Sequence, residues 1–414
     1  MNIVSRCVRC FVIAIVAVCG PGLGAQAPAV DSPLAVIGYF TETGAKSGLF
    51  TVKNLVATGA AARLTELDYA FGRVANDQCQ VADSERALKH SYSAEESVDG
   101  KADADGPNQL RGTFHQLQEL KRLYPKLRVL ISFGGWGASS GFPSAARPDN
   151  LHDFVRSCVH TFIEGYFAPG IRASGIFDGI DIDWEYPVGG GVAPGSPEDK
   201  KNFTAMAAEF RRQLNAVRPG LLLTAALPAE PELYEHFELR EISQYFDDLA
   251  IMAYDLHWDT EPITNLHSAL FHDPADPSKP PYRDYYGDFA VRGFLAAGVP
   301  KEKIIFGVPF YGKGWAGVKD ENHGLYQAAS GPAKVPSAYR VLKALPSAAD
   351  RQFYSATATC SVWNKGNFWS YDCPDAVRAK MAYIRRQQLG GVMFWELSQD
   401  TPDGELLGIL SGSQ

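Results

Sequence analysis

Eight short apolar runs, separated by amphipathic stretches, constrain the fold of this 414-residue chain more than any other feature. This alternation is typical of β/α units around a parallel sheet, because helices that cover such a sheet leave its strands apolar on both faces. Eight units predict an α/β fold of the (β/α)8 TIM barrel type, which takes about 250 residues and tolerates insertions. The runs are residues 34–40, 66–74, 127–133, 175–184, 221–227, 248–254, 304–310 and 391–395, and the expected helices include 110–123, 151–167, 198–217, 290–297 and 376–388.

The chain is longer than such a barrel requires, and the surplus is concentrated between the seventh and eighth runs. Residues 316–372 are rich in Tyr, Ser, Ala and Gly and are long enough for a small α+β unit. A second irregular region covers residues 75–106. We therefore expect a barrel over residues 33–400 with an α+β insertion domain, residues 316–372, between strand seven and strand eight.

Residues 1–27 have the order of a secretory signal peptide. Arg6 and Arg9 precede an apolar stretch over residues 11–18, and small residues follow. That stretch is too short to span a bilayer as a helix, which requires about 20 apolar residues. We therefore expect a secreted protein, extracellular or periplasmic, with no membrane partner after signal removal. Loss of the two arginines takes the formal net charge from −8 to −10, and this acidic balance argues against nucleic acid as a partner.

Four cysteines lie beyond this segment, as suits an exported protein that contains disulfides. They allow three pairings, and the sequence does not choose among them. Cys360 and Cys373 flank one short stretch, which favours that pair, whereas a buried free thiol is the alternative for Cys158. The fourth is Cys79.

The sequence beyond residue 27 contains no pattern typical of a metal or cofactor site. None of its nine histidines forms a His-Glu-x-x-His pair, and there is no Cys-x-x-Cys. We therefore expect no metal and no cofactor.

Residues 177–187 read Phe-Asp-Gly-Ile-Asp-Ile-Asp-Trp-Glu-Tyr-Pro, with four acids inside an apolar segment. Side chains alternate between the faces of a strand, so Asp181, Asp183 and Glu185 point the same way, while Asp178 lies at the strand's entrance. Burying a polar group without a partner costs about 2 to 7 kcal/mol, whereas crowded carboxyls stay protonated near neutral pH, as acid–base chemistry requires. A solvated run or a calcium loop is the alternative, but neither favours the interleaved apolar residues. The segment predicts a catalytic site.

Tryptophans gather where the predicted strands end, which is the face on which TIM barrels hold their active sites. Core packing is the alternative for each one, and for Trp184 above all. Flat apolar rings stack against sugar rings, so a rim of tryptophans favours a polysaccharide cleft. The tryptophans at or just past a strand end are Trp136, Trp184, Trp258, Trp315 and Trp395.

The pattern Asp178-x-x-Asp181-x-Asp183-x-Glu185 resembles the signature of glycoside hydrolase family 18, the chitinases. The resemblance extends over residues 35–399 and includes the insertion found in one bacterial branch of the family. It implies a monomeric enzyme that hydrolyses β-1,4 links between N-acetylglucosamine units in chitin or chito-oligosaccharides. The supporting motifs are Gly38-Tyr39-Phe40, Tyr69-Ala70-Phe71, Ser132-Phe133-Gly134-Gly135-Trp136, Met252-Ala253-Tyr254-Asp255, Phe310-Tyr311-Gly312 and Gly390-Gly391-Val392-Met393-Phe394-Trp395.

The same resemblance implies a retaining, substrate-assisted reaction, in which the N-acetyl oxygen attacks its own anomeric carbon and gives an oxazolinium intermediate. Glu185 would act as the general acid and then as the base. Asp183 would hold the acetamido N–H and share a proton with Asp181. Tyr254 would position the acetamido carbonyl.

The resemblance also implies a set of residues that contact the sugar and two that support the catalytic acids. Ser132 and Asp178 are the expected supporting residues, and Tyr39 is also expected to contact a buried aspartate. One position departs from the family, which usually has Arg where this chain has Lys313. The planar guanidinium group of Arg, which can donate two parallel hydrogen bonds, is thereby replaced by the compact ammonium group of Lys. The expected substrate-binding residues are Tyr39, Phe71, Trp136, Met252, Asp255, Lys313, Trp315 and Trp395.

Two other functions fit the same barrel. An endo-β-N-acetylglucosaminidase acting on N-linked glycans would use the same chemistry, but Met252-Ala253-Tyr254-Asp255, Trp395 and the insertion favour the chitinase. A non-catalytic chitin-binding lectin would typically have lost the acid, and Glu185 is retained. The sequence therefore favours an enzyme.

Overall fold

The computed structural model describes residues 34–46, 50–104, 106, 108–335, 337–346 and 349–413. The expected signal peptide, residues 1–27, lies outside the described residues. Within the described ranges, no helix combines the length and the apolar character needed to traverse a bilayer.

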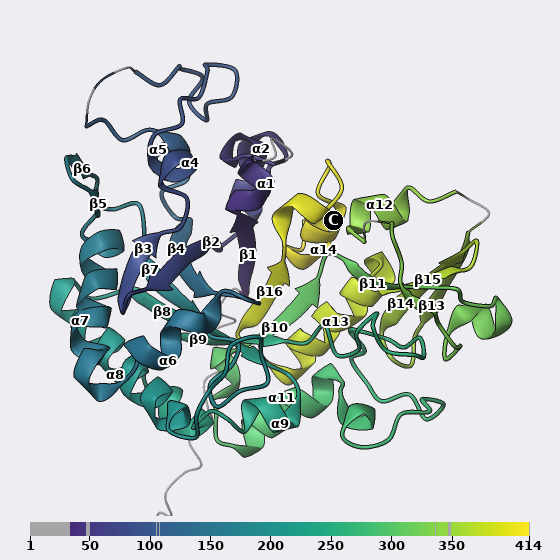
Figure 1. The fold of residues 1–414 in the computed structure, drawn as a ribbon. Helices are drawn as coiled ribbons and strands as arrows, with labels where there is room; N and C mark the ends of the chain where they lie inside the picture. The colour runs from purple at the N-terminus through teal and green to yellow at the C-terminus, as the bar shows by residue number, and fades with distance from the viewer. Residues whose placement is uncertain are drawn as a thin grey trace, which may run out of the picture. The chain divides into compact units, whose positions relative to one another are not determined.

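Eight parallel strands close into a barrel, which confirms the predicted fold (Figure 1). The first strand pairs with both the second and the last, so the sheet has no open edge within the ring. The predicted run at 175–184 is strand over only its second half. Around the ring the strands are β1 Ala35–Thr41, β2 Glu66–Ala75, β4 Arg128–Gly134, β7 Gly179–Asp183, β8 Leu222–Pro228, β9 Asp248–Met252, β10 Ile304–Pro309 and β16 Gly391–Trp395.

Helices on the outside of the barrel bury the outward faces of the strands. The helix expected over 151–167 is shorter, because it passes into a π-helical turn at Val159–Ile163 and then into strand β5, Tyr166–Ala168, which pairs with β6, Ile171–Arg172. The longer helices are α5 Gly112–Leu123, α7 Pro148–Cys158, α8 Asp199–Val217, α11 Gly287–Ala296 and α13 Pro374–Gln387. The short ones are α1 Glu42–Lys46, α2 Val52–Ala57, α3 Ala60–Arg63, α4 Ser84–Leu88, α6 Phe142–Ala145, α9 Pro231–Tyr234, α10 Leu239–Ile242 and α14 Glu405–Leu410.

A five-stranded antiparallel sheet is inserted between β10 and α13, as predicted. It begins at Gly312, four residues before the expected boundary, so Lys313 and Trp315 belong to the inserted sheet and not to a barrel strand. Trp315 is fully buried there, packed against Phe368. The elements of the insertion are β11 Gly312–Ala316, β12 Gly331–Pro332, α12 Tyr339–Lys343, β13 Asp350–Tyr354, β14 Thr359–Asn364 and β15 Asn367–Tyr371.

A buried ion pair joins the insertion to the barrel helices. Lys380 of α13 contacts Asp372, which directly follows β15, and both side chains are 0% exposed. The Lys380 Nζ also donates to the carbonyl of Ser268 at 2.7 Å, and the Ser268 hydroxyl donates to Asp372 at 2.9 Å. Each charge thus has hydrogen-bonding partners that offset its desolvation.

Two disulfides settle the pairing that the sequence left open. Cys360 joins Cys373, the favoured pair, and Cys79 joins Cys158. The free-thiol alternative for Cys158 is therefore wrong, because the hairpin of β2 with β3, Gln78–Val81, packs its Cys79 against α7.

Candidate active site

The register of β7 with its neighbours places the motif acids. Asp181 lies beside Ser132 of β4 and Thr224 of β8, and Asp183 lies beside Gly134. Gly134 has a φ of +115°, and a Cβ there would lie 1.9 Å from the Asp183 carbonyl oxygen. Only glycine permits this close approach.

Asp178 lies at the opposite end of β7 from the other three acids. Its carboxylate contacts Lys121 at 2.5 Å and Arg218 at 3.6 Å, and it accepts a hydrogen bond from the backbone of Val129 at 3.0 Å. The expectation that Asp178 supports the catalytic acids is wrong, because its opposite parity and its place at the strand's start direct it to the amino end of the barrel.

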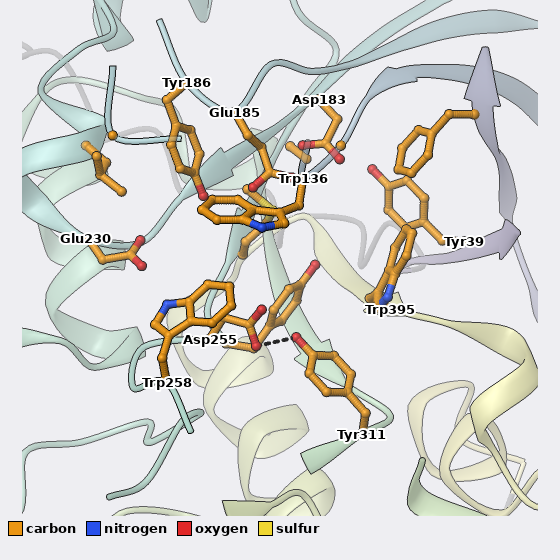
Figure 2. Close-up of a pocket in the computed structure, with 17 residues that line it drawn as sticks. Tyr39, Trp136, Asp183, Glu185, Tyr186, Glu230, Asp255, Trp258, Tyr311 and Trp395 are labelled. Carbon is orange, nitrogen blue, oxygen red and sulfur yellow. Dashed lines mark hydrogen bonds between the residues drawn. The ribbon is translucent and has the colours of Figure 1, made fainter. Parts of the chain in front are cut away.

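A cavity of about 270 Å³ opens at the carboxyl ends of the strands, and Figure 2 shows Asp183 and Glu185 on its wall. It gathers residues from all eight barrel strands or from the loops that follow them. Most of the expected sugar contacts lie there, whereas Asp181 lies deeper, and Lys313 and Trp315 are not among the lining residues. The cavity is lined by Tyr39, Phe71, Gly135, Trp136, Asp183, Glu185, Tyr186, Gly190, Ala226, Glu230, Leu233, Met252, Tyr254, Asp255, Trp258, Tyr311 and Trp395.

Asp181 is held by three hydroxyl groups in the barrel interior. It accepts hydrogen bonds from Ser132 at 2.6 Å, Thr224 at 2.7 Å and Tyr39 at 2.8 Å. The expected contacts of Tyr39 and Ser132 with a buried aspartate are present, and Thr224 is a third that the sequence analysis missed. Burial raises the pKa of Asp181, and the three hydroxyls oppose that rise because they stabilise its charged form.

Asp183 has no comparable support. Its Oδ1 is buried and has no hydrogen-bond partner among the described residues. Burial, followed by the charges of Glu185 and Asp181, raises the pKa of Asp183 well above its ordinary value. The three hydroxyls therefore favour the charged form of Asp181, whereas no described side chain does so for Asp183.

Glu185 lies two residues after Asp183, just past the end of β7, and is 8% exposed. Burial raises the pKa of Glu185 to about 7, with a hydrogen bond from Tyr186 opposing the rise and the Asp255 charge adding to it. The backbone N–H of Glu185 donates to the Ser139 hydroxyl at 2.9 Å, and that hydroxyl also contacts the Asp183 carbonyl at 3.2 Å. Ser139 therefore fixes the backbone between the two acids.

Asp255 is the charged carboxylate of the opposite wall. It accepts a hydrogen bond from the Tyr311 hydroxyl at 2.6 Å and forms an ion pair with Lys313 at 3.2 Å. Burial would raise the pKa of Asp255, but a hydrogen bond from the buried His267, the Lys313 charge and Tyr311 together lower it. Lys313 also lies 3.9 Å from the centroid of the Trp258 ring. Its contacts therefore hold Asp255 and Trp258 in place.

Aromatic rings form two groups around the cavity. Trp395 packs on Tyr39 with ring centroids 5.3 Å apart and on Phe71 at 5.7 Å. Trp136, which is 53% exposed, meets Trp258 at 5.3 Å. Three of the five rim tryptophans thus line the cavity, and the core alternative holds for the other two, since Trp184 is 1% and Trp315 0% exposed.

Tyr254 lies in the cavity wall, and its hydroxyl is 3.6 Å from the sulfur of Met393. That thioether is a weak acceptor, so the phenol hydrogen can turn to a stronger acceptor that enters the cavity. Met252 lies at the same end of β9 and lines the cavity beside it.

Among the described residues, no group of His, Cys, Asp and Glu side chains is arranged to hold a metal ion. One acid in the cavity was missed by the sequence analysis: Glu230, two residues past β8. The sequence contains one indication of Glu230: it is an isolated acid just beyond a predicted strand end, which is where TIM barrels carry their functional residues.

The chain is 36% identical over 396 residues to Chitinase C of Streptomyces lividans, covering 93% of this chain and 59% of that relative's length. The solved catalytic domain of the psychrophilic chitinase B from Arthrobacter TAD20 matches with a TM-score of 0.85 and 34% identity, over 92% of this chain and 94% of that one. A family 18 N-acetylglucosaminidase from Paenibacillus barengoltzii matches with a TM-score of 0.73 and 28% identity, over 92% and 100%. Residues 35–400 match the family described as Glycosyl hydrolases family 18, and this chain belongs to that family.

Proposed function

We propose that this protein is a chitinase that hydrolyses β-1,4 links between N-acetylglucosamine units in chitin or chito-oligosaccharides. The observation that carries the proposal is Glu185, a carboxyl with a pKa of about 7 in an aromatic-walled cavity, beside an aspartate with an unpaired buried oxygen. A carboxyl of this kind is protonated often enough near neutral pH to act as an acid, and it can then act as a base.

The side chains fit a retaining, substrate-assisted reaction. Glu185 donates its proton to the glycosidic oxygen as that bond breaks, while the carbonyl oxygen of the substrate's N-acetyl group bonds to the anomeric carbon. The Asp183 carboxyl accepts the acetamido N–H, and Tyr254 donates to the acetamido carbonyl. Glu185, now charged, takes a proton from the water that opens the oxazolinium ring. The proton is thereby returned to Glu185 and the anomeric configuration is retained.

Hydrolysis of a chitin oligosaccharide series, with product lengths and anomers followed, tests this proposal. Wild-type protein is expected to release β-anomers, and Glu185→Gln is expected to lose about 10² to 10⁴ in rate, which is the range for removal of a general acid. The matched control is Glu232→Gln, an exposed acid outside the cavity, which should retain activity. Inverted products, or full activity in Glu185→Gln, would refute the mechanism.

The alternatives are separated by the choice of substrate. Cleavage of a high-mannose glycoprotein without cleavage of chitin oligomers would identify an endo-β-N-acetylglucosaminidase. Binding of chitin oligomers without turnover, in folded wild-type protein, would identify a lectin. Release of a terminal sugar alone would match the N-acetylglucosaminidase to which the fold is similar.

We also propose that the protein is secreted as a monomer after removal of residues 1–27. The two disulfides suit an oxidising compartment. Expression in a bacterial host, followed by mass measurement of the exported protein and sedimentation, tests both points. An uncleaved intracellular product or a dimer would contradict them.

A further inference from the structure

The cavity is acidic and has no base on its wall. Four carboxyl groups line it, those of Asp183, Glu185, Glu230 and Asp255, and no lysine or arginine does so within the described residues. Lys313 compensates Asp255 from behind. The other three carboxyl groups have no cationic partner among the described residues.

Glu230 is the acid that the reaction leaves without a task. It immediately precedes helix α9 but makes no capping hydrogen bond with its side chain. No described residue forms an ion pair with Glu230, and its side chain is partly exposed to the cavity. Burial raises the pKa of Glu230 to about 8, with the charges of Asp255 and Glu232 adding to the rise. The raised pKa means that burial disfavours the charged form of Glu230, and a cation beside the carboxyl would stabilise that form.

Figure 2 places Glu230 and Trp395 on opposite sides of Glu185. In the proposed reaction the sugar that reacts lies next to Asp183 and Tyr254, because its acetamido group must reach both. Asp183 lies on the same side of Glu185 as Trp395. The bond to be broken lies at Glu185. The sugar that leaves therefore occupies the side of Glu230 and of the paired rings of Trp136 and Trp258.

Within this substrate class, one kind of unit carries a positive charge. Deacetylation of N-acetylglucosamine gives glucosamine, whose 2-amino group is an ammonium in mildly acidic solution. The reacting sugar must keep its acetyl group, because that group is the nucleophile. The leaving position has no such requirement.

We propose that Glu230 is a specificity-determining residue that makes the leaving-sugar position prefer glucosamine over N-acetylglucosamine. The inference rests on the proposed function. At mildly acidic pH the free Glu230 carboxyl holds its proton because burial raises its pKa. The arriving ammonium would displace that proton to solvent and donate a charge-assisted hydrogen bond to the resulting carboxylate, while the sugar ring stacks on the neighbouring indoles.

The test is cleavage of a randomly half-deacetylated chitosan at pH 6, with the sugars at the new chain ends identified by NMR. Each new non-reducing end reports a sugar from the leaving position. Wild-type protein is expected to give non-reducing ends enriched in glucosamine above the polymer's composition. Glu230→Gln, which keeps the shape but not the charge, should lower the glucosamine to N-acetylglucosamine ratio about ten-fold, the effect of losing one charge-assisted hydrogen bond. Glu232→Gln, with the same change in net charge, should not lower it.

Failure of this inference and failure of the proposed function have different signatures. Cleavage of fully acetylated hexamer by the wild type, with the same end ratio in Glu230→Gln, overturns the inference and leaves the function standing. If no polymer is cleaved, the function is wrong, and calorimetric titration with a fully deacetylated tetramer still tests the site. There Glu230→Gln must weaken binding about ten-fold relative to Glu232→Gln, and equal binding would refute the inference.

Discussion

Replacing Glu185 by glutamine should stabilise the folded protein in a pH-dependent way. The pKa of Glu185 is about 7 in the folded site, against an ordinary value of 4.5. One pKa unit corresponds to about 1.36 kcal/mol, so ionising Glu185 in the folded protein costs about 3.4 kcal/mol more than in the unfolded chain. Glutamine has a similar shape and carries no charge, so the variant avoids this cost.

The sign follows from proton binding. Between pH 4.5 and about 7 the folded protein holds the Glu185 proton and the unfolded chain does not. The free energy of unfolding of the wild type therefore falls through this window as pH rises, relative to the variant. The two proteins should be equally stable at pH 4, and Glu185→Gln should be more stable by about 3 kcal/mol at pH 8.

Urea denaturation followed by tryptophan fluorescence at pH 4, 6 and 8 measures this difference. With an m value of about 3 kcal/mol/M, the expected shift in midpoint at pH 8 is about 1 M. Glu232→Gln, at an exposed site, should show no pH-dependent shift against wild type. A gain in stability for Glu185→Gln that is the same at pH 4 and pH 8 would show that burial of this carboxyl does not act through its charge.

Three further outcomes are expected. The kcat/KM on a chitin oligomer should fall as pH rises through about 7, because Glu185, the proposed general acid, loses its proton there. A profile that is flat from pH 6 to 9 would contradict this. Lys380→Met should lower the free energy of unfolding by about 3 to 5 kcal/mol, because Asp372 is left as an unpaired buried charge; the double variant with Asp372→Asn should recover much of the loss in the same denaturation assay. Thr224→Val should cost about 1 to 3 kcal/mol, because one Asp181 oxygen loses its partner, and denaturation at pH 7 measures it.

The barrel was predictable because its signals are local. Each apolar run can be recognised within a window of ten residues. The alternation of side chains in a strand places Asp181, Asp183 and Glu185 on one face, whichever strands pair with it. The opposite parity of Asp178 was equally legible, and it pointed away from the site. The aromatic rim followed from the rule that catalytic groups follow the strand ends.

The features that could not be predicted from the sequence depend on contacts between distant segments of the chain. Thr224 supports Asp181 only because β8 takes one particular register beside β7. Cys79 reaches Cys158 through the packing of a hairpin on a helix, 79 residues away in the chain. Trp315 lies just past a barrel strand, but the backbone has already joined the inserted sheet, so the indole is directed into a separate core.

Because Asp178 is ion-paired away from the cavity, the four acids of the motif have two different roles. At one end of β7 an acid holds the carboxyl ends of helices α5 and α8 through Lys121 and Arg218, and at the other end lie the acids of the proposed reaction. A descendant that abandoned hydrolysis would be free to exchange Glu185, but loss of Asp178 would loosen the barrel itself. On the proposed function, the first acid of the motif therefore bears on folding and the last on the reaction.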